Sequence, residues 1–124
     1  MGKGQSFLCA SDRGEDRHLH VIITIPDDKN IVLTVPICTY NEKPWQDSTC
    51  ILPAGCHPFV KKRSYINYQY AKEMSLIDIF NCLRKGIFIQ KSDFDMKYVQ
   101  DMQKGAEETL HLPEKMKRFF EHFF

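Results

Sequence analysis

The sequence predicts a mainly β domain with helices at its C-terminal end, an α+β fold built on a small β-barrel or a strongly twisted sheet. Two runs rich in β-branched residues, 21–25 and 31–35, flank a polar turn at 27–30, which is the pattern of a β-hairpin. Shorter apolar segments lie on either side of this hairpin. The last third of the chain changes to apolar residues at helical spacing.

The hairpin is expected to form the core. Both of its runs are almost continuously apolar, whereas a strand with one exposed face would alternate. Pro26 and Pro36 lie at the ends of the runs, where a missing N–H does least harm to the hydrogen-bond ladder. We therefore expect strands that are buried on both faces, in a closed barrel or in a sheet covered by other elements.

Shorter segments supply the remaining strands. Strands are expected at 6–9, 50–53, 64–71 and 87–89. The polar stretch 40–49 is predicted to be a long connection, of the kind that often binds a ligand.

Two helices with defined ends are predicted in the second half of the chain. Ser75 is the expected N-cap of a short helix that ends at Gly86. The Ser92-Asp93 pair is expected to cap the longest helix, which Pro113 stops. The apolar residues of this longest helix recur at helical spacing and are Phe94, Tyr98, Val99, Met102, Ala106 and Leu110.

The chain is expected to consist of a barrel domain at 1–112 and a helical tail at 113–124. The tail is amphipathic and carries more phenylalanine than a free end should expose. Its phenylalanines are Phe119, Phe120, Phe123 and Phe124.

Charge and composition exclude several classes of function. With 17 basic and 16 acidic residues, the chain is neither a strongly basic nucleic-acid coat nor a polybasic membrane tail, although a local basic patch is allowed. No apolar run approaches the roughly 20 residues that span a bilayer, and the N-terminus lacks a signal-peptide core. Five cysteines without a C-x-x-C pair indicate reduced thiols. We expect a cytoplasmic protein with no membrane partner.

A metal site and a cysteine nucleophile are the weaker chemical alternatives. His18 and His20 lie on the same side of a strand. A zinc site would need further ligands from Cys50, Cys56 or His57, and no fixed spacing of these residues indicates one. Cys56 and His57 are adjacent, so in extended chain their side chains point to opposite faces. We expect no metal and no cofactor.

The two ends of the hairpin carry residues suited to phosphodiester chemistry. Arg13 and Arg17 precede the hairpin, and Cys38 and Thr39 follow it. Pairing the strands around the polar turn brings the neighbourhood of Arg17 level with that of Cys38, Thr39 and Tyr40, and His18 adds an imidazole at the same rim. Arginine binds phosphate bidentately and stabilises charge that develops on it.

A second basic segment, with aromatic residues near it, could bind unpaired bases. Its members are Lys61, Lys62 and Arg63, with Tyr65, Tyr68 and Trp45. The plainer interpretation of both regions is a solvated loop and a solvated turn.

Three segments resemble the MazF/PemK-like toxins of toxin–antitoxin systems. Arg17-His-Leu-His-Val-Ile-Ile23, followed by Ile31-Val-Leu-Thr-Val-Pro-Ile-Cys-Thr39, resembles the R-P-x-x-V-I-S … V-x-V-x-P-I-T arrangement of that family. Arg63-Ser-Tyr-Ile-Asn-Tyr-Gln-Tyr70 resembles its D-S-x-V-x-x-x-Q-I strand. The segment from residue 79 into the helix after Ser92 resembles its closing L-x-x-x-x-G-x-L region. The likeness covers most of residues 4–112.

The resemblance implies an SH3-like barrel with a C-terminal helix, a homodimer, and a metal-independent endoribonuclease toxin that an antitoxin protein neutralises. In that family an arginine and a threonine cooperate while the RNA 2′-hydroxyl attacks the adjacent phosphate. Arg17 matches the arginine. Cys38 occupies the place of the threonine and Thr39 follows one position later, where a local bulge would restore it.

The candidate catalytic residues are therefore Arg17, Thr39, His18 and His57, with either histidine as the proton carrier. The candidate substrate-binding residues are Arg13, Trp45, Lys61, Lys62 and Arg63.

An alternative function is a non-catalytic protein-binding module on the same barrel, with a zinc or cysteine hydrolase as a third. The displaced threonine and the apolar tail favour the binding module. This alternative predicts that deleting residues 114–124 abolishes a dimer or a complex without unfolding residues 1–112.

Overall fold

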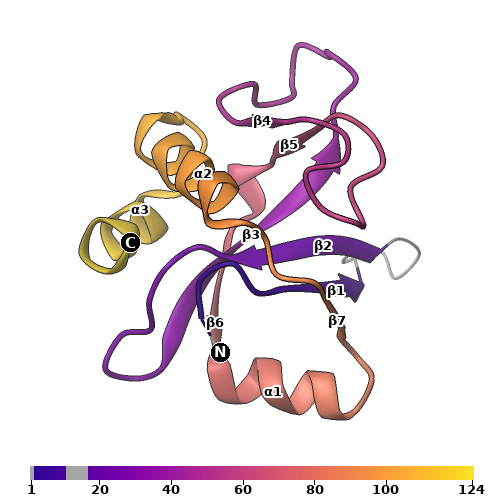
Figure 1. Ribbon diagram of the computed structural model, residues 1–124. Helices are drawn as coiled ribbons and strands as arrows, with labels where there is room; N and C mark the ends of the chain where they lie inside the picture. Colours follow the sequence, from indigo (N-terminus) through magenta and orange to yellow (C-terminus); the bar gives the residue numbers. More distant parts are fainter. Residues whose placement is uncertain (1, 11–16) are drawn as a thin grey trace.

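The computed structural model describes residues 2–10 and 17–124, apart from the side chains of residues 10 and 17. Within these residues the fold is mixed α/β, with a seven-stranded antiparallel sheet and three α-helices (Figure 1). The predicted α+β class with C-terminal helices is confirmed. In chain order the elements are β1 (Ser6–Ala10), β2 (Arg17–Ile22), β3 (Ile31–Thr39), β4 (Ile51–Leu52), β5 (Ser64–Ile66), the 3₁₀ helix η1 (Tyr68–Tyr70), β6 (Lys72–Ser75), α1 (Leu76–Arg84), β7 (Ile89–Lys91), α2 (Met96–Glu108) and α3 (Glu114–Phe123).

The predicted hairpin is confirmed as the centre of the sheet. β2 and β3 pair antiparallel, with Leu19 opposite Ile37 and Val21 opposite Val35. The nine-residue β3 also pairs with β6 through residues 31–34 and with β5 through residues 37–39. Pro36 lies at the switch between these two partners, where its missing N–H interrupts neither ladder.

The predicted closure into a small SH3-like barrel is not confirmed. The described strands follow the order β4-β5-β3-β2-β1-β7, with β6 paired to β3 beside this path, and the two end strands do not pair with each other. The sheet is therefore open. Its central strands are nevertheless buried on both faces, because helices cover the sheet on both sides. This agrees with the predicted alternative of a sheet covered by other elements.

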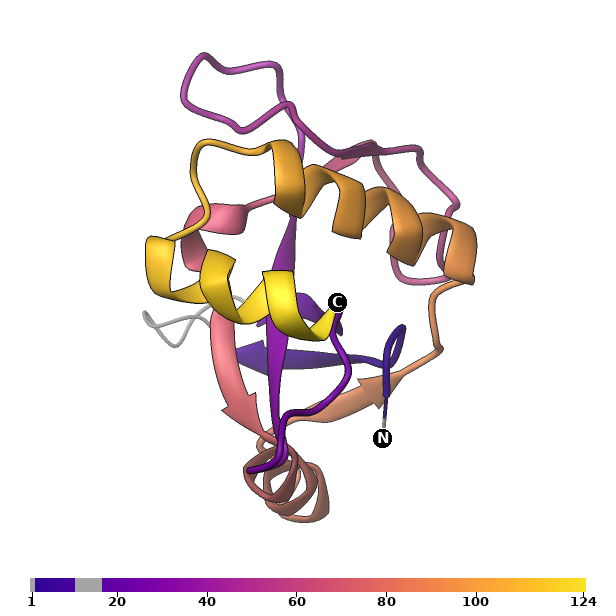
Figure 2. The same ribbon diagram turned by 90° about the vertical axis from the view of Figure 1, so that its left-hand side faces the viewer.

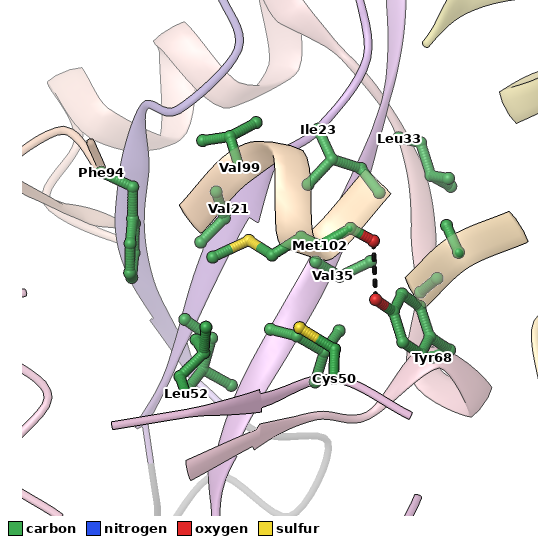
Figure 3. Close-up of a cluster of buried hydrophobic side chains, with 14 of the residues drawn as sticks. Val21, Ile23, Leu33, Val35, Cys50, Leu52, Tyr68, Phe94, Val99 and Met102 are labelled. Carbon is green, nitrogen blue, oxygen red and sulfur yellow. Dashed lines mark hydrogen bonds between the residues drawn. The ribbon is translucent and has the colours of Figure 1, made fainter. Parts of the chain in front are cut away.

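The two faces of the sheet carry separate cores. Leu8, Val21 and Leu33 belong to the larger cluster, which α2 and α3 cover (Figures 2 and 3). Phe7 and Ile22, at alternate positions of the same strands, belong to the smaller cluster, which also contains Ile79 of α1 and so lies on the opposite face.

The ends of α1 are confirmed, whereas the predicted start of α2 is wrong. The hydroxyl of Ser75 accepts a hydrogen bond from the Ile77 N–H at 3.2 Å, and Gly86 follows the helix with a φ of 74°. In α2 the N-cap is Asp95, whose carboxylate accepts from the Lys97 N–H at 3.0 Å, instead of the Ser92-Asp93 pair.

The strand predicted at 64–71 is also wrong beyond residue 66. Tyr68 is fully buried, and its hydroxyl donates to the Met102 carbonyl at 2.6 Å (Figure 3). Gly105 allows this approach, because a Cβ there would collide with the Tyr68 hydroxyl. The chain turns into η1 to place this ring, and the unpredicted β6 follows. The strand predicted at 87–89 lies at Ile89–Lys91, two residues later.

The C-terminal tail forms α3 and packs on the larger core. Phe120 is 1% exposed and belongs to the same cluster as the sheet residues. Phe119 and Met116 pack against that cluster. The Ile25 N–H donates to the Phe123 carbonyl at 2.8 Å, so the end of the tail is also joined to the hairpin.

The longest helix ends earlier than its apolar spacing predicts. α2 ends at Glu108, and Leu110, predicted on its buried face, is 95% exposed. None of the helices in the described part of the chain is long and apolar enough to cross a membrane.

Candidate functional site

The hairpin register relates the start of β2 to the end of β3. The last pair between β2 and β3 is Leu19 with Ile37, and the same register continued by two residues would place Arg17 level with Thr39. Arg17 also pairs with the end of β1. Its side chain lies outside the described atoms, and Arg13 lies outside the described residues.

A pocket of about 280 Å³ opens at this end of the hairpin. Residues from β2, from the end of β3 and from the turn before β5 line it, among them His18, Cys38, Thr39, Phe59, Lys61 and Lys62. Four of the candidate residues predicted from the sequence therefore line one pocket: His18, Thr39, Lys61 and Lys62.

Short hydrogen bonds hold the turn that carries the two lysines. The Gly55 N–H donates to the Val60 carbonyl at 2.8 Å, and the Ser64 hydroxyl donates to the Lys62 carbonyl at 2.8 Å. Ser64 pairs with Thr39 across the β3–β5 ladder. The turn is thus fixed to the strand that supplies the hydroxyl, while the side chains of Lys61 and Lys62 remain exposed.

Cys38 and Thr39 are both among the residues that line the pocket, although adjacent side chains of a strand point to opposite faces. The pairing of β3 with β5 is regular over residues 37–39. Burial raises the pKa of the Cys38 thiol, although its hydrogen bonds with Asn67 and Tyr65 act in the opposite direction. The thiol is therefore protonated at neutral pH and is a poor nucleophile.

The structure does not bring His57 to this pocket. The imidazole is 3% exposed and stacks on Phe94, with ring centroids 4.3 Å apart. Its Nδ1 accepts from the Phe59 N–H at 3.0 Å, so in the neutral ring the proton is on Nε2, which lies 2.6 Å from the Ser92 carbonyl oxygen. Both nitrogens are thus engaged in structural contacts, and among the described histidines it is His18 that lines the pocket.

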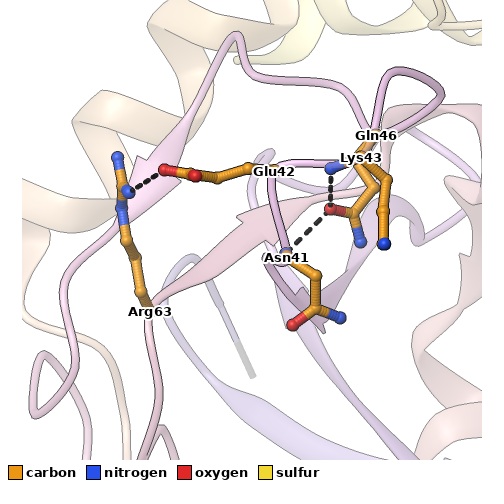
Figure 4. Close-up of polar contacts among 5 residues, drawn as sticks. All are labelled: Asn41, Glu42, Lys43, Gln46 and Arg63. Atoms are coloured by element: carbon orange, nitrogen blue, oxygen red, sulfur yellow. Dashed lines mark hydrogen bonds and ion pairs between the residues drawn. The ribbon is translucent and has the colours of Figure 1, made fainter.

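Arg63 points to the neighbouring loop and not into the pocket. Its guanidinium forms an ion pair with Glu42 at 3.2 Å (Figure 4) and lies over the Tyr40 ring, 5.2 Å from the centroid. Both partners of the ion pair are exposed, so it contributes little to stability.

The loop after β3 is organised around Gln46. The Gln46 amide oxygen accepts from the Asn41 N–H at 2.8 Å and from the Lys43 N–H at 3.2 Å (Figure 4), and its NH₂ group donates to the Thr39 carbonyl at 3.1 Å. Trp45, in the same loop, is 77% exposed and does not belong to the pocket lining.

The predicted aromatic surface needs a correction. Tyr65 and Tyr68 are 6% and 0% exposed, because both rings pack inward from β5 and η1, so neither ring offers a face to solvent. The aromatic residue that does line the pocket is Phe59, which is 42% exposed and was missed. Its position two residues before the Lys61-Lys62 pair was the available signal.

A larger pocket of about 750 Å³ lies at the other end of the hairpin, beside α1. Its lining is mostly apolar, with Ile77, Phe80 and Leu83 from the helix, and its one charged member is Arg84. It contains no nucleophile and no candidate proton carrier. The chemistry-bearing residues are therefore gathered at the smaller pocket.

The structure offers no metal centre within residues 2–10 and 17–124. No group of three or more histidine, cysteine, aspartate or glutamate side chains is placed there to hold an ion. His57 in particular has both nitrogens in hydrogen bonds with protein groups.

Comparisons with protein-family models, with curated proteins and with solved structures gave no match.

Proposed function

We propose that this chain is a MazF/PemK-like endoribonuclease toxin that cleaves single-stranded RNA in the cytoplasm without a metal ion. One observation carries the proposal: His18, Thr39, Lys61 and Lys62 line one pocket at the end of the hairpin. The resemblance adds Arg17, which the hairpin register, if continued by two residues beyond its last pair, would place level with Thr39.

These groups suit an attack of the RNA 2′-hydroxyl on the adjacent phosphorus. The new bond is O2′–P and the broken bond is P–O5′, which leaves a 2′,3′-cyclic phosphate and a 5′-hydroxyl. The ammonium groups of Lys61 and Lys62 bind the phosphate and offset the charge that develops on it. His18 is the candidate carrier of the proton that leaves the 2′-hydroxyl and of the proton that the 5′-oxygen gains, and Thr39 positions the phosphate or the reacting hydroxyl.

The further parts of the proposal come from the resemblance. An SH3-like barrel, a homodimer and a neutralising antitoxin protein are expected of a MazF/PemK-like toxin. The antiparallel sheet with a C-terminal helix is compatible with this relationship.

The test is cleavage of a labelled single-stranded RNA by the purified chain in the presence of a chelator. We expect cleavage by the wild type and a loss of at least about tenfold in Arg17→Ala, His18→Ala and the Lys61→Ala/Lys62→Ala variant. Lys29→Ala is the matched control, because Lys29 is exposed in the turn at the opposite end of the same hairpin. Its activity should equal that of the wild type.

Two outcomes would contradict the proposal. One is an RNA that stays intact with the wild type, and the other is cleavage that Arg17→Ala leaves unchanged. Circular dichroism of each variant shows whether a lost activity reflects lost structure.

The alternative of a protein-binding module loses the surface that motivated it. Phe120 lies in the core, and Phe119 and Phe123 are half-buried, so the tail does not display its phenylalanines as one docking face. Deletion of residues 114–124 is now expected to destabilise the sheet, and it no longer separates the two functions.

A further inference from the structure

We propose that Phe59 and Lys91 form a subsite that stacks one unpaired base of the RNA and binds its phosphate. This inference rests on the proposed function, because it adds a substrate contact to the same pocket. Phe59 lines the pocket beside Lys61 and Lys62 and remains 42% exposed. An aromatic face within a cationic groove is the common device by which proteins hold single-stranded nucleic acid.

The Phe59 ring is carried by a rigid turn. The Phe59 N–H donates to Nδ1 of His57 at 3.0 Å, and the Val60 N–H donates to the His57 carbonyl at 2.9 Å. His57 itself is buried against Phe94. The backbone of Phe59 is thus fixed before any ligand binds, so stacking a base on its ring orders few additional groups.

Lys91 reaches the same ring from a different element. Its ammonium lies over the Phe59 ring, 5.6 Å from the centroid, and its backbone ends β7. The next residue, Ser92, gives its carbonyl to His57. The buried His57 therefore contacts both the turn that carries Phe59 and the segment that follows Lys91. His57 is thus a positioning residue, a role that the sequence did not predict.

The arrangement differs from an ordinary exposed aromatic residue. Single exposed apolar side chains are common and need no explanation. Trp45 is such a residue, since it is 77% exposed and lies outside the pocket lining. Phe59 instead lies among three lysines, one of which is in cation–π contact with its ring. A base of the RNA can stack on the Phe59 ring, and the negatively charged phosphates of the RNA backbone can bind the lysines.

The experiment measures binding of fluorescent eight-nucleotide RNAs by anisotropy. The RNAs are 2′-O-methylated at every position, which removes the attacking hydroxyl, and a series carries one abasic position at a time. We expect the wild type to lose about tenfold in affinity when one particular base is absent, because that base has nothing to stack. Phe59→Ala should bind the intact RNA about tenfold more weakly and should no longer distinguish it from that abasic RNA.

Further variants distinguish a loss of base stacking from a loss of structure and from a loss of positive charge. Phe59→Trp should retain the base dependence, and Lys91→Gln should lower the slope of log affinity against log salt by about one. Tyr70→Ala is the matched control, since Tyr70 is 57% exposed on η1 and does not line the pocket. It should bind all the RNAs as the wild type does.

The outcomes distinguish the subsite from the function on which it rests. If the wild type binds none of the RNAs, the proposed function and the subsite are both overturned. If the wild type binds RNA and Phe59→Ala keeps the same base dependence, the subsite alone is wrong and the ribonuclease proposal stands.

Discussion

The two faces of the sheet are covered to very different depths. On one face, α2 and α3 bury Tyr68, Met102 and Phe120 almost completely. On the other face, α1 contributes one fully buried side chain, Ile79, while Ile77 of the same helix is 62% exposed. Figure 2 shows α2 and α3 layered together over the sheet, with α1 at its lower end.

This difference indicates that the face under α2 and α3 contributes most of the stability, and that the α1 face tolerates a buried polar side chain. Burial of apolar surface is the main favourable term in folding, and most of it lies under α2 and α3. The α1 face holds His20, which is 5% exposed and whose Nδ1 has no hydrogen-bond partner among the described residues. The small pocket lies at the strand ends, where Leu19 from one face and His18 from the other both line it.

The largest expected effect is on the α2–α3 face, at Phe120. Phe120→Ala should lower the free energy of unfolding by about 3–5 kcal/mol, because it leaves a cavity in the main core. Urea denaturation followed by circular dichroism measures it. Phe124→Ala is the control in the same helical tail, because Phe124 is 55% exposed, and it should cost less than about 1 kcal/mol. Equal losses would mean that the tail does not close this core.

The same contrast explains how far the fold could be predicted from the sequence. The hairpin was predictable because two apolar, β-branched runs flank a short polar turn, and this local pattern depends on no distant contact. The end of the strand after Ser64 was not predictable. There, Tyr68 leaves the strand pattern to reach the Met102 carbonyl, which is a contact across 34 positions of sequence. Tertiary packing overrides local alternation at such a position.

The candidate site was predictable where it depends on register. Counting outward from the turn brings His18 to the pocket that Thr39 lines, and the structure agrees. Lys61 and Lys62 reach the same pocket only because β5 returns beside β3, which composition could not show. His57 was misplaced because its neighbours Phe94 and Ser92 are distant in sequence.

On the α1 face, the protonation of His20 is expected to have an intermediate effect on the free energy of unfolding. Burial, with smaller contributions from Lys72 and His18, lowers the pKa of His20 from 6.5 to about 4. Between these values the unfolded chain binds a proton that the folded chain does not, so the free energy of unfolding falls as the pH falls from 6.5 to 4. The loss is about 3 kcal/mol at most.

The pH dependence of urea unfolding tests this origin. The ring of His20 stacks on Phe7, with ring centroids 6.0 Å apart, and His20→Phe keeps a ring in this place. The variant should flatten the pH dependence of the free energy of unfolding between pH 6.5 and 4. His122→Gln, a change at an exposed histidine, should keep the wild-type slope. A slope that His20→Phe leaves unchanged would assign the acid sensitivity to other groups.

The smallest expected change in the free energy of unfolding comes from replacing isoleucine by valine at two positions of α1. Ile79→Val should lower the free energy of unfolding by about 1 kcal/mol, because the lost methylene leaves a gap in the smaller core. Ile77→Val removes the same atoms from a side chain that is 62% exposed and should cost less than about 0.5 kcal/mol. The helix-propensity term is the same in both variants and cancels in the comparison. Equal losses in urea denaturation would contradict the expectation that Ile79 is packed in the smaller core and Ile77 is not.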